Sequence, residues 1–274
     1  MGASPMSTIT RPARTARPSR SRRFITDTLA LAGRSLAKFR RNPQAIVFTI
    51  VQPVMFVLLF RYVFGGAIET PPGVDYVNLL IPGIVVQNAL FSAASASVAI
   101  SDDLASGFTD RLRSLPTARL APLTGRVLAD TLRAGLLVVV IFIVGLLVGF
   151  RPEWGPGLLV AWLLLMVIAF GFAWIAVAIG VSVKSPEVAQ SAGFIWIFPL
   201  TFASSVFVPV STMPDWLAWF ATINPVTQFA NATRGLVLLG EVDSAMGWTI
   251  LWVVIFAVVG GFLSIRGWNR MTRA

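Results

Sequence analysis

The sequence contains no cysteine and no histidine. Without cysteine, the chain forms no disulfide and offers no thiolate to a metal ion. Without histidine, catalysis by imidazole and metal sites with histidine ligands are excluded as well. We therefore expect no catalytic residue, no metal site and no cofactor bound by this chain.

Charged residues are also scarce, at 12% of the chain against about 25% in an average soluble domain. Hydrophobic residues make up 56%, and the mean hydropathy is +0.78. This composition predicts an all-α polytopic membrane protein. No acidic residue lies deep in an apolar segment, which counts against an ion-coupled secondary transporter and against an intramembrane enzyme.

A phosphate-binding loop is missing too. Such a loop needs Gly-Lys followed by Ser or Thr. The two lysines of the chain, Lys38 and Lys184, follow Ala37 and Val183. If ATP is the energy source, we expect ATP and its magnesium ion to be bound by a separate polypeptide.

Six apolar segments are long enough to cross a membrane, since twenty residues of helix extend about 30 Å. They are residues 45–64, 76–100, 123–150, 157–183, 188–210 and 248–265. All but three of the 22 basic residues lie on one side of this arrangement; the exceptions are Arg61, Arg151 and Arg234. The positive-inside rule therefore predicts a cell-membrane protein with both termini in the cytoplasm.

The first 23 residues are rich in arginine, proline, serine and threonine, which predicts a disordered basic cytoplasmic leader. Its charge favours contact with anionic membrane lipid, and nucleic acid is the less favoured alternative. Residues 24–41 then place apolar and basic side chains on opposite sides of a helix, which predicts an amphipathic helix in the plane of the membrane. Its apolar stripe comprises Ile25, Leu29, Ala32, Leu36 and Phe39.

A broken, moderately apolar region at residues 211–247 predicts two short helices, at about 215–222 and 226–239. Trp216 and Trp219 favour a membrane–water interface, so we expect an external re-entrant hairpin. Arg126, Asp130 and Arg133 lie one turn apart at the start of the third span. We expect them to form a charge cluster beside the membrane with little net energetic value.

Residues 102–115 form the most charged internal segment. Leu104, Phe108, Leu112 and Leu115 recur at helical spacing, while acidic and basic residues occupy the other faces. We expect a separate amphipathic helix here, capped by Ser101 and ended by Pro116. The pattern alone allows a helix resting on the membrane or a docking element for a soluble partner.

Four stretches resemble a known family. They are GFTDRLRSLP at 107–116, LTGR at 123–126, RNPQAIVFTIVQPVMFVLLFRYVFGGAI at 41–68 and FASSVFVPVSTMPDWLAWFATINPVTQFANATRGL at 202–236. They are similar to ABC type-2 exporter permeases, with the daunorubicin-resistance branch nearest, and the resemblance covers residues 24–270 as one transmembrane domain. Many members carry glutamate four residues before the loop glycine, where this chain has Asp103.

The resemblance implies that residues 102–115 are the coupling helix that docks on an ABC ATP-binding subunit. The docking residues would be Asp103, Leu104, Gly107, Phe108, Asp110, Arg111, Leu112, Arg113, Leu115 and Pro116. In this docked arrangement Asp103 and Asp110 would face basic groups of the ATPase. A second permease copy or a paralogue would complete a dimer around the transport pathway.

The resemblance also implies export of a small hydrophobic or amphipathic drug-like compound, with export of a lipid or lipid-linked polysaccharide as the alternative. The second and fifth spans would line the pathway. Candidates that combine aromatic faces with hydrogen-bonding groups are Gln87, Asn88, Ser92, Ser95, Phe202, Ser205 and Phe207. Packing inside the helical bundle is the competing interpretation of these residues, especially in the small-residue run 92–97.

Overall fold

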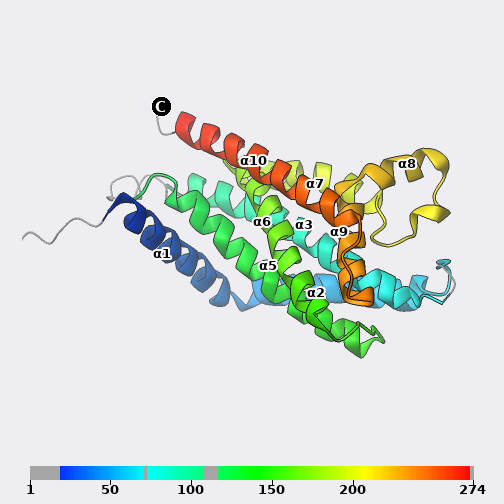
Figure 1. Ribbon diagram of the computed structural model, residues 1–274. Coiled ribbons are helices and arrows are strands. Elements are labelled where there is room, and N and C mark those ends of the chain that lie inside the picture. Colours follow the sequence, from blue (N-terminus) through cyan, green and yellow to red (C-terminus); the bar gives the residue numbers. More distant parts are fainter. Residues whose placement is uncertain (1–18, 71–72, 108–116, 272–274) are drawn as a thin grey trace, which may run out of the picture.

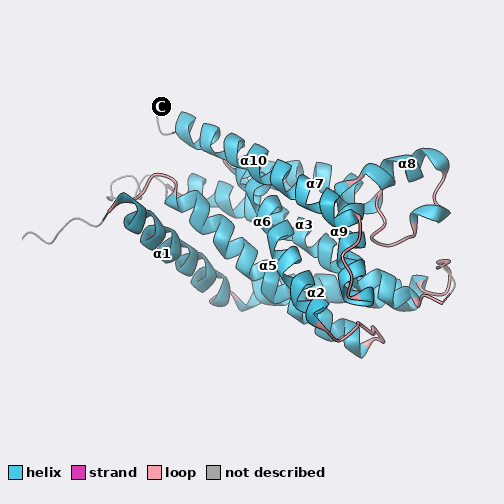
Figure 2. Cartoon of the chain, viewed as in Figure 1, coloured by secondary structure: helices cyan, strands magenta, loops and turns pink. Residues whose placement is uncertain are grey.

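The structure is a computed structural model that describes residues 19–70, 73–107 and 117–271, and all regular elements within these ranges are helical (Figures 1 and 2). This confirms the predicted all-α membrane fold. The long helices are α1 (Arg20–Arg40), α2 (Pro43–Leu58), α3 (Tyr76–Ala105), α5 (Ala121–Leu147), α6 (Pro156–Gly180), α7 (Pro186–Phe202) and α10 (Ala245–Met271). The shorter elements are η1 (Leu59–Phe64), η2 (Val210–Thr212), α8 (Asp215–Ile223), α9 (Pro225–Arg234) and η3 (Gly235–Leu239).

Local sequence explains where several helices begin. The side chains of Asn42, Ser185 and Asn224 accept hydrogen bonds from backbone N–H groups in the first turns of α2, α7 and α9. A proline follows each of these caps, where its missing N–H costs nothing and its fixed φ suits a helix. The predicted hairpin helices are confirmed as α8 and α9, with η3 continuing α9.

Helix α3 forms the centre of the bundle and packs against α2, α5, α6, α7 and α9. Of its most apolar stretch, 83% of the residues are buried, against 11% for the continuous helix made by α2 and η1. Leu80, Ile81, Ile84 and Leu90 have no exposed surface. The other helices therefore surround α3, and α2 leaves most of its surface uncovered.

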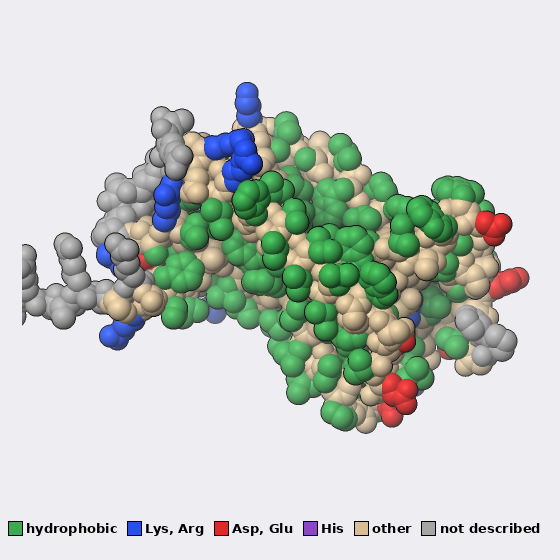
Figure 3. All heavy atoms as spheres, turned by 45° about the horizontal axis from the view of Figure 1, so that its top comes forward, with side chains coloured by type: hydrophobic (Ala, Val, Ile, Leu, Met, Phe, Trp, Pro, Cys, Tyr) green, Lys and Arg blue, Asp and Glu red, His purple; other side chains and the backbone are tan. Residues whose placement is uncertain are grey.

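Five helical segments are long and apolar enough to cross a membrane: α2 with η1, α3, α5, α6 and α10. Figure 3 shows hydrophobic side chains covering the middle of the molecule, with basic side chains at one end and acidic ones at the other. The predicted fifth span corresponds to α7, which has 17 residues and extends only about 26 Å. The count of six spans therefore stays a prediction.

The outer end of the predicted fifth span is wrong, because α7 stops at Phe202 and not at residue 210. The amide nitrogen of Asn224 donates hydrogen bonds to the carbonyl oxygens of Leu200 and Ala203, at 2.9 and 2.8 Å. These bonds satisfy two carbonyls that the end of the helix leaves without partners. A side chain from the hairpin thus ends α7.

Helix α1 begins at Arg20, so residues 20–23 of the predicted leader are helical; residues 1–18 lie outside the described part of the chain. Thr28 of α1 shares a hydrogen bond with Thr124 of α5, at 3.0 Å. Further along, the ring of Phe39 lies 5.2 Å from the guanidinium of Arg133. The contacts advance in the same direction on both helices, so α1 runs beside the first half of α5 (Figure 1).

Packing against α5 covers one side of this first helix, and its predicted place in the membrane plane stays a prediction. The face centred on Thr28 and Ala32 packs against α5, and Ala32 is only 3% exposed. Ile25 and Leu29 lie beside that face and are each 57% exposed. An amphipathic pattern suits a membrane surface and a protein surface equally well, and here α5 covers much of the apolar stripe.

Adjacent glycines on α10 provide a test of the close helix packing. A Cβ added at Gly260 would lie 2.7 Å from backbone atoms of Trp174 and Ile175 on α6, whereas one at Gly261 would lie 3.8 Å from its nearest neighbour. We expect Gly260→Ala to lower the stability of the protein by about 1–3 kcal/mol, because backbone cannot move aside cheaply. Gly261→Ala is the matched control and should leave the thermal unfolding temperature unchanged or raise it. Equal unfolding temperatures for the two variants would contradict the close α6–α10 contact.

Candidate functional site

The inner end of α3 differs from the prediction of a separate coupling helix starting at Asp102. Ser101 is 2% exposed inside α3, which continues through Asp102 and Leu104 to Ala105. Gly107 follows with φ = +67°, a conformation that favours glycine and ends the helix. Ser101 therefore caps no helix, because the chain is already helical on both sides of it.

The remaining residues assigned to docking lie outside the described part of the chain. They are Phe108, Asp110, Arg111, Leu112, Arg113, Leu115 and Pro116. Their docking role stays a prediction, as does that of Leu104 and Gly107 at the start of the segment.

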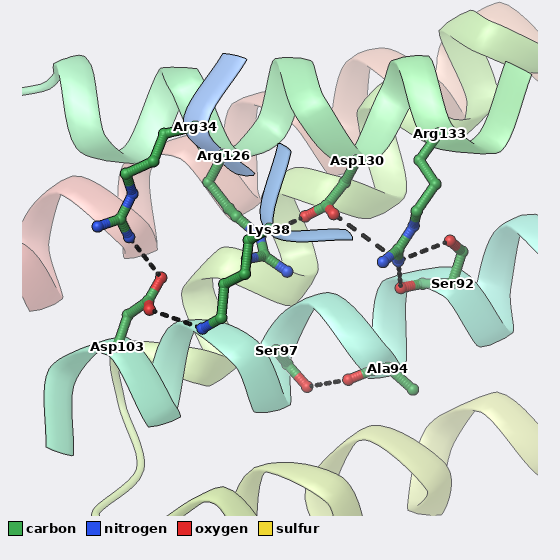
Figure 4. A network of polar contacts seen from close by, with 9 residues as sticks. All are labelled: Arg34, Lys38, Ser92, Ala94, Ser97, Asp103, Arg126, Asp130 and Arg133. Carbon is green, nitrogen blue, oxygen red and sulfur yellow. Dashed lines mark hydrogen bonds and ion pairs between the residues drawn. The ribbon is translucent and has the colours of Figure 1, made fainter. Parts of the chain in front are cut away.

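Both flanks of this 108–116 segment are tied to α1. Before it, a carboxylate oxygen of Asp103 lies 3.4 Å from Nζ of Lys38, and the other lies 3.7 Å from Nη2 of Arg34 (Figure 4). After it, a carboxylate oxygen of Asp27 accepts a hydrogen bond from the backbone N–H of Ala118, at 2.8 Å. Helix α1 therefore contacts the chain on both sides of the segment.

Within this chain Asp103 pairs with Arg34 and Lys38, and its side chain is 21% exposed. Its predicted contact with basic groups of an ATPase stays a prediction. Asp102, which is 59% exposed, lies 3.7 Å from Lys38 and retains an open face. Ion pairs as exposed as these stabilise by at most about 1 kcal/mol, so they set position more than stability.

Arg126, Asp130 and Arg133 of α5 form the predicted charge cluster, and most of its surface is covered. Their side chains are 12%, 8% and 13% exposed. Nε of Arg126 donates to a carboxylate oxygen of Asp130 at 2.8 Å, and Nη2 of Arg133 lies 3.7 Å from the other oxygen (Figure 4). Nη2 of Arg133 also donates to Oγ of Ser92 at 3.1 Å. Ser92, a candidate for the transport pathway, is thus engaged by a buried arginine.

A ring of six phenylalanines joins α2, η1, α3, α7 and the segment after α7, and we name it the phenylalanine belt. Its members are Phe56, Phe60, Phe91, Phe198, Phe202 and Phe207. The closest pair is Phe60 and Phe207, whose ring centroids are 4.1 Å apart. Phe198 and Phe202 are 44% and 49% exposed. The belt therefore presents aromatic faces at the surface of the chain.

Of the predicted pathway residues, Phe202 and Phe207 belong to the belt, with ring centroids 5.5 Å apart. Gln87 and Asn88 line a small cavity behind Phe56 and Phe91. This cavity of about 10 Å³ holds one water molecule at most, so it is no ligand site as it stands. Phe56, Phe60, Phe91 and Phe198 were missed, because single-sequence reasoning does not show which faces of separate helices meet.

The other two candidates take different roles. The hydroxyl of Ser95 donates to the carbonyl oxygen of Phe91 on its own helix, at 3.3 Å. The hydroxyl of Ser205 lies 3.0 Å from Nη1 of Arg234, which donates to it. The structure thus groups four of the seven candidates at or behind the belt and places Ser92, Ser95 and Ser205 outside it.

Arg234, near the end of α9, clamps the outer part of the molecule. Its Nε and Nη2 both donate to the carbonyl oxygen of Leu79 on α3, at 3.0 and 2.8 Å. Nη2 also donates to the carbonyl oxygen of Ser205 at 2.6 Å, and Nη1 donates to the amide oxygen of Asn231 at 3.0 Å. Burial lowers the pKa of Arg234 to about 10, so the guanidinium remains charged at neutral pH.

The clamp has a second contact close by. The hydroxyl of Tyr76, at the start of α3, donates to the carbonyl oxygen of Phe207 at 3.0 Å. Together with Arg234, this bond joins α3, the segment after α7 and α9 into one unit. Arg234 is the one charged residue between positions 216 and 240, and this isolated charge is the signal in the sequence for such a role.

The geometry is that of a membrane-embedded helical domain whose inner loop is attached to a flanking helix and whose outer hairpin is clamped to the central helix. The sequence profile of the ABC-2 type transporter family matches residues 26–238. The chain belongs to this family, whose membership implies an ABC ATP-binding partner.

Curated relatives extend over most of the chain. It is 33% identical over 221 residues to the daunorubicin resistance ABC transporter permease protein DrrB1 of Streptomyces coeruleorubidus, covering 80% of this chain and 77% of the relative. It is 25% identical over 253 residues to a probable doxorubicin resistance permease, DrrC, of Mycobacterium tuberculosis, covering 91% of both. A putative transport permease, ycf38, of Cyanophora paradoxa is 23% identical over 255 residues and 88% of both chains.

Replacement of the clamp residue tests its contribution. We expect Arg234→Gln to lower the stability of the protein by about 3 kcal/mol, because the buried carbonyl oxygens of Leu79 and Ser205 would lose charged donors. Arg61→Gln is the control, since Arg61 pairs at 3.4 Å with an Asp75 side chain that is 53% exposed. We expect its loss to cost less than about 1 kcal/mol. The measurement is thermal unfolding of both variants in detergent. If the two unfolding midpoints fell by the same amount, the contacts of Arg234 would not be a special source of stability.

Proposed function

We propose that this chain is the permease subunit of an ATP-driven exporter that moves a hydrophobic or amphipathic drug-like compound out of the cell. The membership of the ABC-2 family carries this proposal, supported by two relatives named for resistance to daunorubicin and doxorubicin. The chain has no Gly-Lys-Ser/Thr motif, so ATP hydrolysis takes place in a separate subunit. The basic end of the molecule and both termini face the cytoplasm of a cell-membrane protein.

The phenylalanine belt supports a planar aromatic cargo. Aromatic rings stack with about 0.5–1.5 kcal/mol per pair beyond the burial of their surface, and ligand sites combine such faces with few polar groups. The half-exposed rings of Phe198 and Phe202 connect through Phe91 and Phe207 to Phe56 of α2, a helix that is covered on little of its surface. A second permease copy or a paralogue faces this side, and the cargo passes between the two belts.

The transport step couples two conformations of the permease to two states of the ATPase pair. Closure of the ATPases displaces the 108–116 segment, and the contacts of Asp103 and Asp27 pass the displacement to α1. Helix α3 transmits the displacement to the outer hairpin through the contact between Leu79 and Arg234. Such coupling requires that the ATPase binds the two permease conformations with different affinity.

Alanine at an exposed belt position tests the cargo site. We expect Phe202→Ala to weaken the apparent affinity for a planar aromatic drug about tenfold, since it removes two ring contacts of the belt and the contact with cargo. The measurement is drug-stimulated ATPase activity of the reconstituted complex. Phe262→Ala on α10 is the control, because Phe262 is 61% exposed and is no member of the belt. Equal drug affinity in both variants would remove the belt from the transport pathway.

A polar residue in the predicted stripe of the 102–115 segment tests the docking role. We expect Leu112→Asp to abolish co-purification with the ATP-binding subunit and drug-stimulated ATP hydrolysis, because a charge would replace a buried apolar contact. The permease itself should still insert into the membrane. Leu112→Met keeps the apolar side chain and should retain both activities. Full efflux by the Leu112→Asp complex would show that the partner docks elsewhere.

A further inference from the structure

A cavity of about 180 Å³ lies between α1, α3 and α5, close to the junction of α1 and α2, and the transport mechanism leaves it unused. Its walls include Lys38, Phe39 and Asn42 on one side and Arg126, Asp130 and Arg133 on the other. It thus combines cationic groups, an amide and an aromatic ring around a space large enough for a small polar ligand group.

The charges around this cavity do not balance. Arg126 and Arg133 share one carboxylate, and Asp130 lies much nearer to Arg126, at 2.8 Å, than to Arg133, at 3.7 Å. Nε of Arg133 is buried and has no hydrogen-bond partner among residues 19–70, 73–107 and 117–271. Lys38 is already compensated by Asp102 and Asp103. One buried positive charge is left over, which is costly unless an anion accompanies it.

The position of the cavity along the bundle indicates where such an anion would come from. Arg133 directly precedes the apolar part of α5, which begins at Ala134, and Asn42 directly precedes the first residue of α2. Both helices have the length and hydropathy of membrane spans. The cavity therefore lies where hydrocarbon gives way to headgroups, at the level of the lipid phosphates.

We propose that this cavity is a phosphate-anion site that takes the headgroup phosphate of an anionic phospholipid from the inner leaflet. Guanidinium groups match phosphate oxygens with two parallel hydrogen bonds, and Arg126 and Arg133 supply two such groups. The exposed apolar side chains of Val47 and Phe48, which follow the cavity residues Asn42 and Ala45 on α2, lie open to the acyl chains. A lipid bound here would join α1 to α3 and α5. The charge of the membrane lipids would then set the position of α1, which flanks the 108–116 segment. The inference does not depend on the identity of the cargo.

The test is a titration of the full-length chain in detergent with short-chain phosphatidylglycerol, phosphatidylcholine or inorganic phosphate, with thermal unfolding as the measurement. We expect a saturable rise in unfolding temperature with phosphatidylglycerol, and little change with phosphatidylcholine or inorganic phosphate at equal concentration. Arg133→Gln should weaken the apparent affinity for phosphatidylglycerol about tenfold, as expected for the loss of one charge-assisted contact. Arg266→Gln makes the same charge change at an exposed position of α10 and should bind like the unaltered protein.

The Asp130→Asn variant distinguishes an effect on lipid binding from an effect on protein stability. It removes the one acidic group among the residues that line the cavity and leaves the side-chain shape nearly unchanged. We expect this variant to unfold at a lower temperature without lipid, yet to bind phosphatidylglycerol several-fold more tightly. Weaker binding of phosphatidylglycerol by Asp130→Asn, or unchanged binding by Arg133→Gln, would show that the lipid phosphate does not bind in this cavity. Equal stabilisation by the two lipids would overturn the requirement for an anionic headgroup. Stabilisation by inorganic phosphate as large as that by lipid would overturn the lipid assignment and favour a free anion.

Discussion

The burial of α3 is the constraint on which the rest of the structure depends. This helix contacts five other helices, and several of its apolar side chains, among them Leu80, Ile84 and Leu90, have no exposed surface. Small residues allow several of these neighbours to approach closely. Gly180 of α6, for example, would bring an added Cβ to 2.7 Å from the carbonyl oxygen of Ser97. Such packing resists continuous deformation, so a force on one end of α3 reaches the other.

Polar contacts hold the two ends of α3, where the apolar packing stops. At the outer end, the carbonyl oxygen of Leu79 accepts two bonds from Arg234, and Tyr76 binds the backbone at Phe207. At the inner end, Asp103 lies between Arg34 and Lys38 of α1. Thirty residues of helix extend about 45 Å, enough to join a cytoplasmic docking segment to an external hairpin across one membrane. In the proposed mechanism, this one helix connects the segment that docks on the ATPase to the outer hairpin.

Hydropathy and local sequence predicted most of the elements, because both act over short distances along the chain. The apolar stretches and the two short helices of the tryptophan-rich hairpin appear near their predicted positions, apart from the outer end of the fifth span. The errors arise where distant residues decide. Asn224 satisfies the last carbonyl oxygens of α7 from the hairpin, and α5 covers part of the apolar stripe of α1.

Contacts between residues far apart in the sequence also explain which parts of the candidate site were not predicted. Arg234 and Leu79 are 155 positions apart in the sequence, and no local pattern joins them. Arg126 and Asp130 have a recognisable helical spacing, but the sequence does not reveal that α1 and α3 bury them. The phenylalanine belt gathers rings from three helices, η1 and a loop, so only two of its members could be chosen from composition and family resemblance.

The most direct test of the account asks whether α3 and the outer hairpin move as one body. The chain has no cysteine, so Ser106→Cys and Thr222→Cys provide two unique, exposed positions for spin labels, one after the inner end of α3 and one on α8. The distance between the labels is measured by pulsed electron paramagnetic resonance in the complex with its ATPase, with and without trapped ATP. The account predicts an unchanged distance within one permease, while the distance between Ser106 labels on two permease copies shortens. A change within one permease as large as that between copies would contradict it.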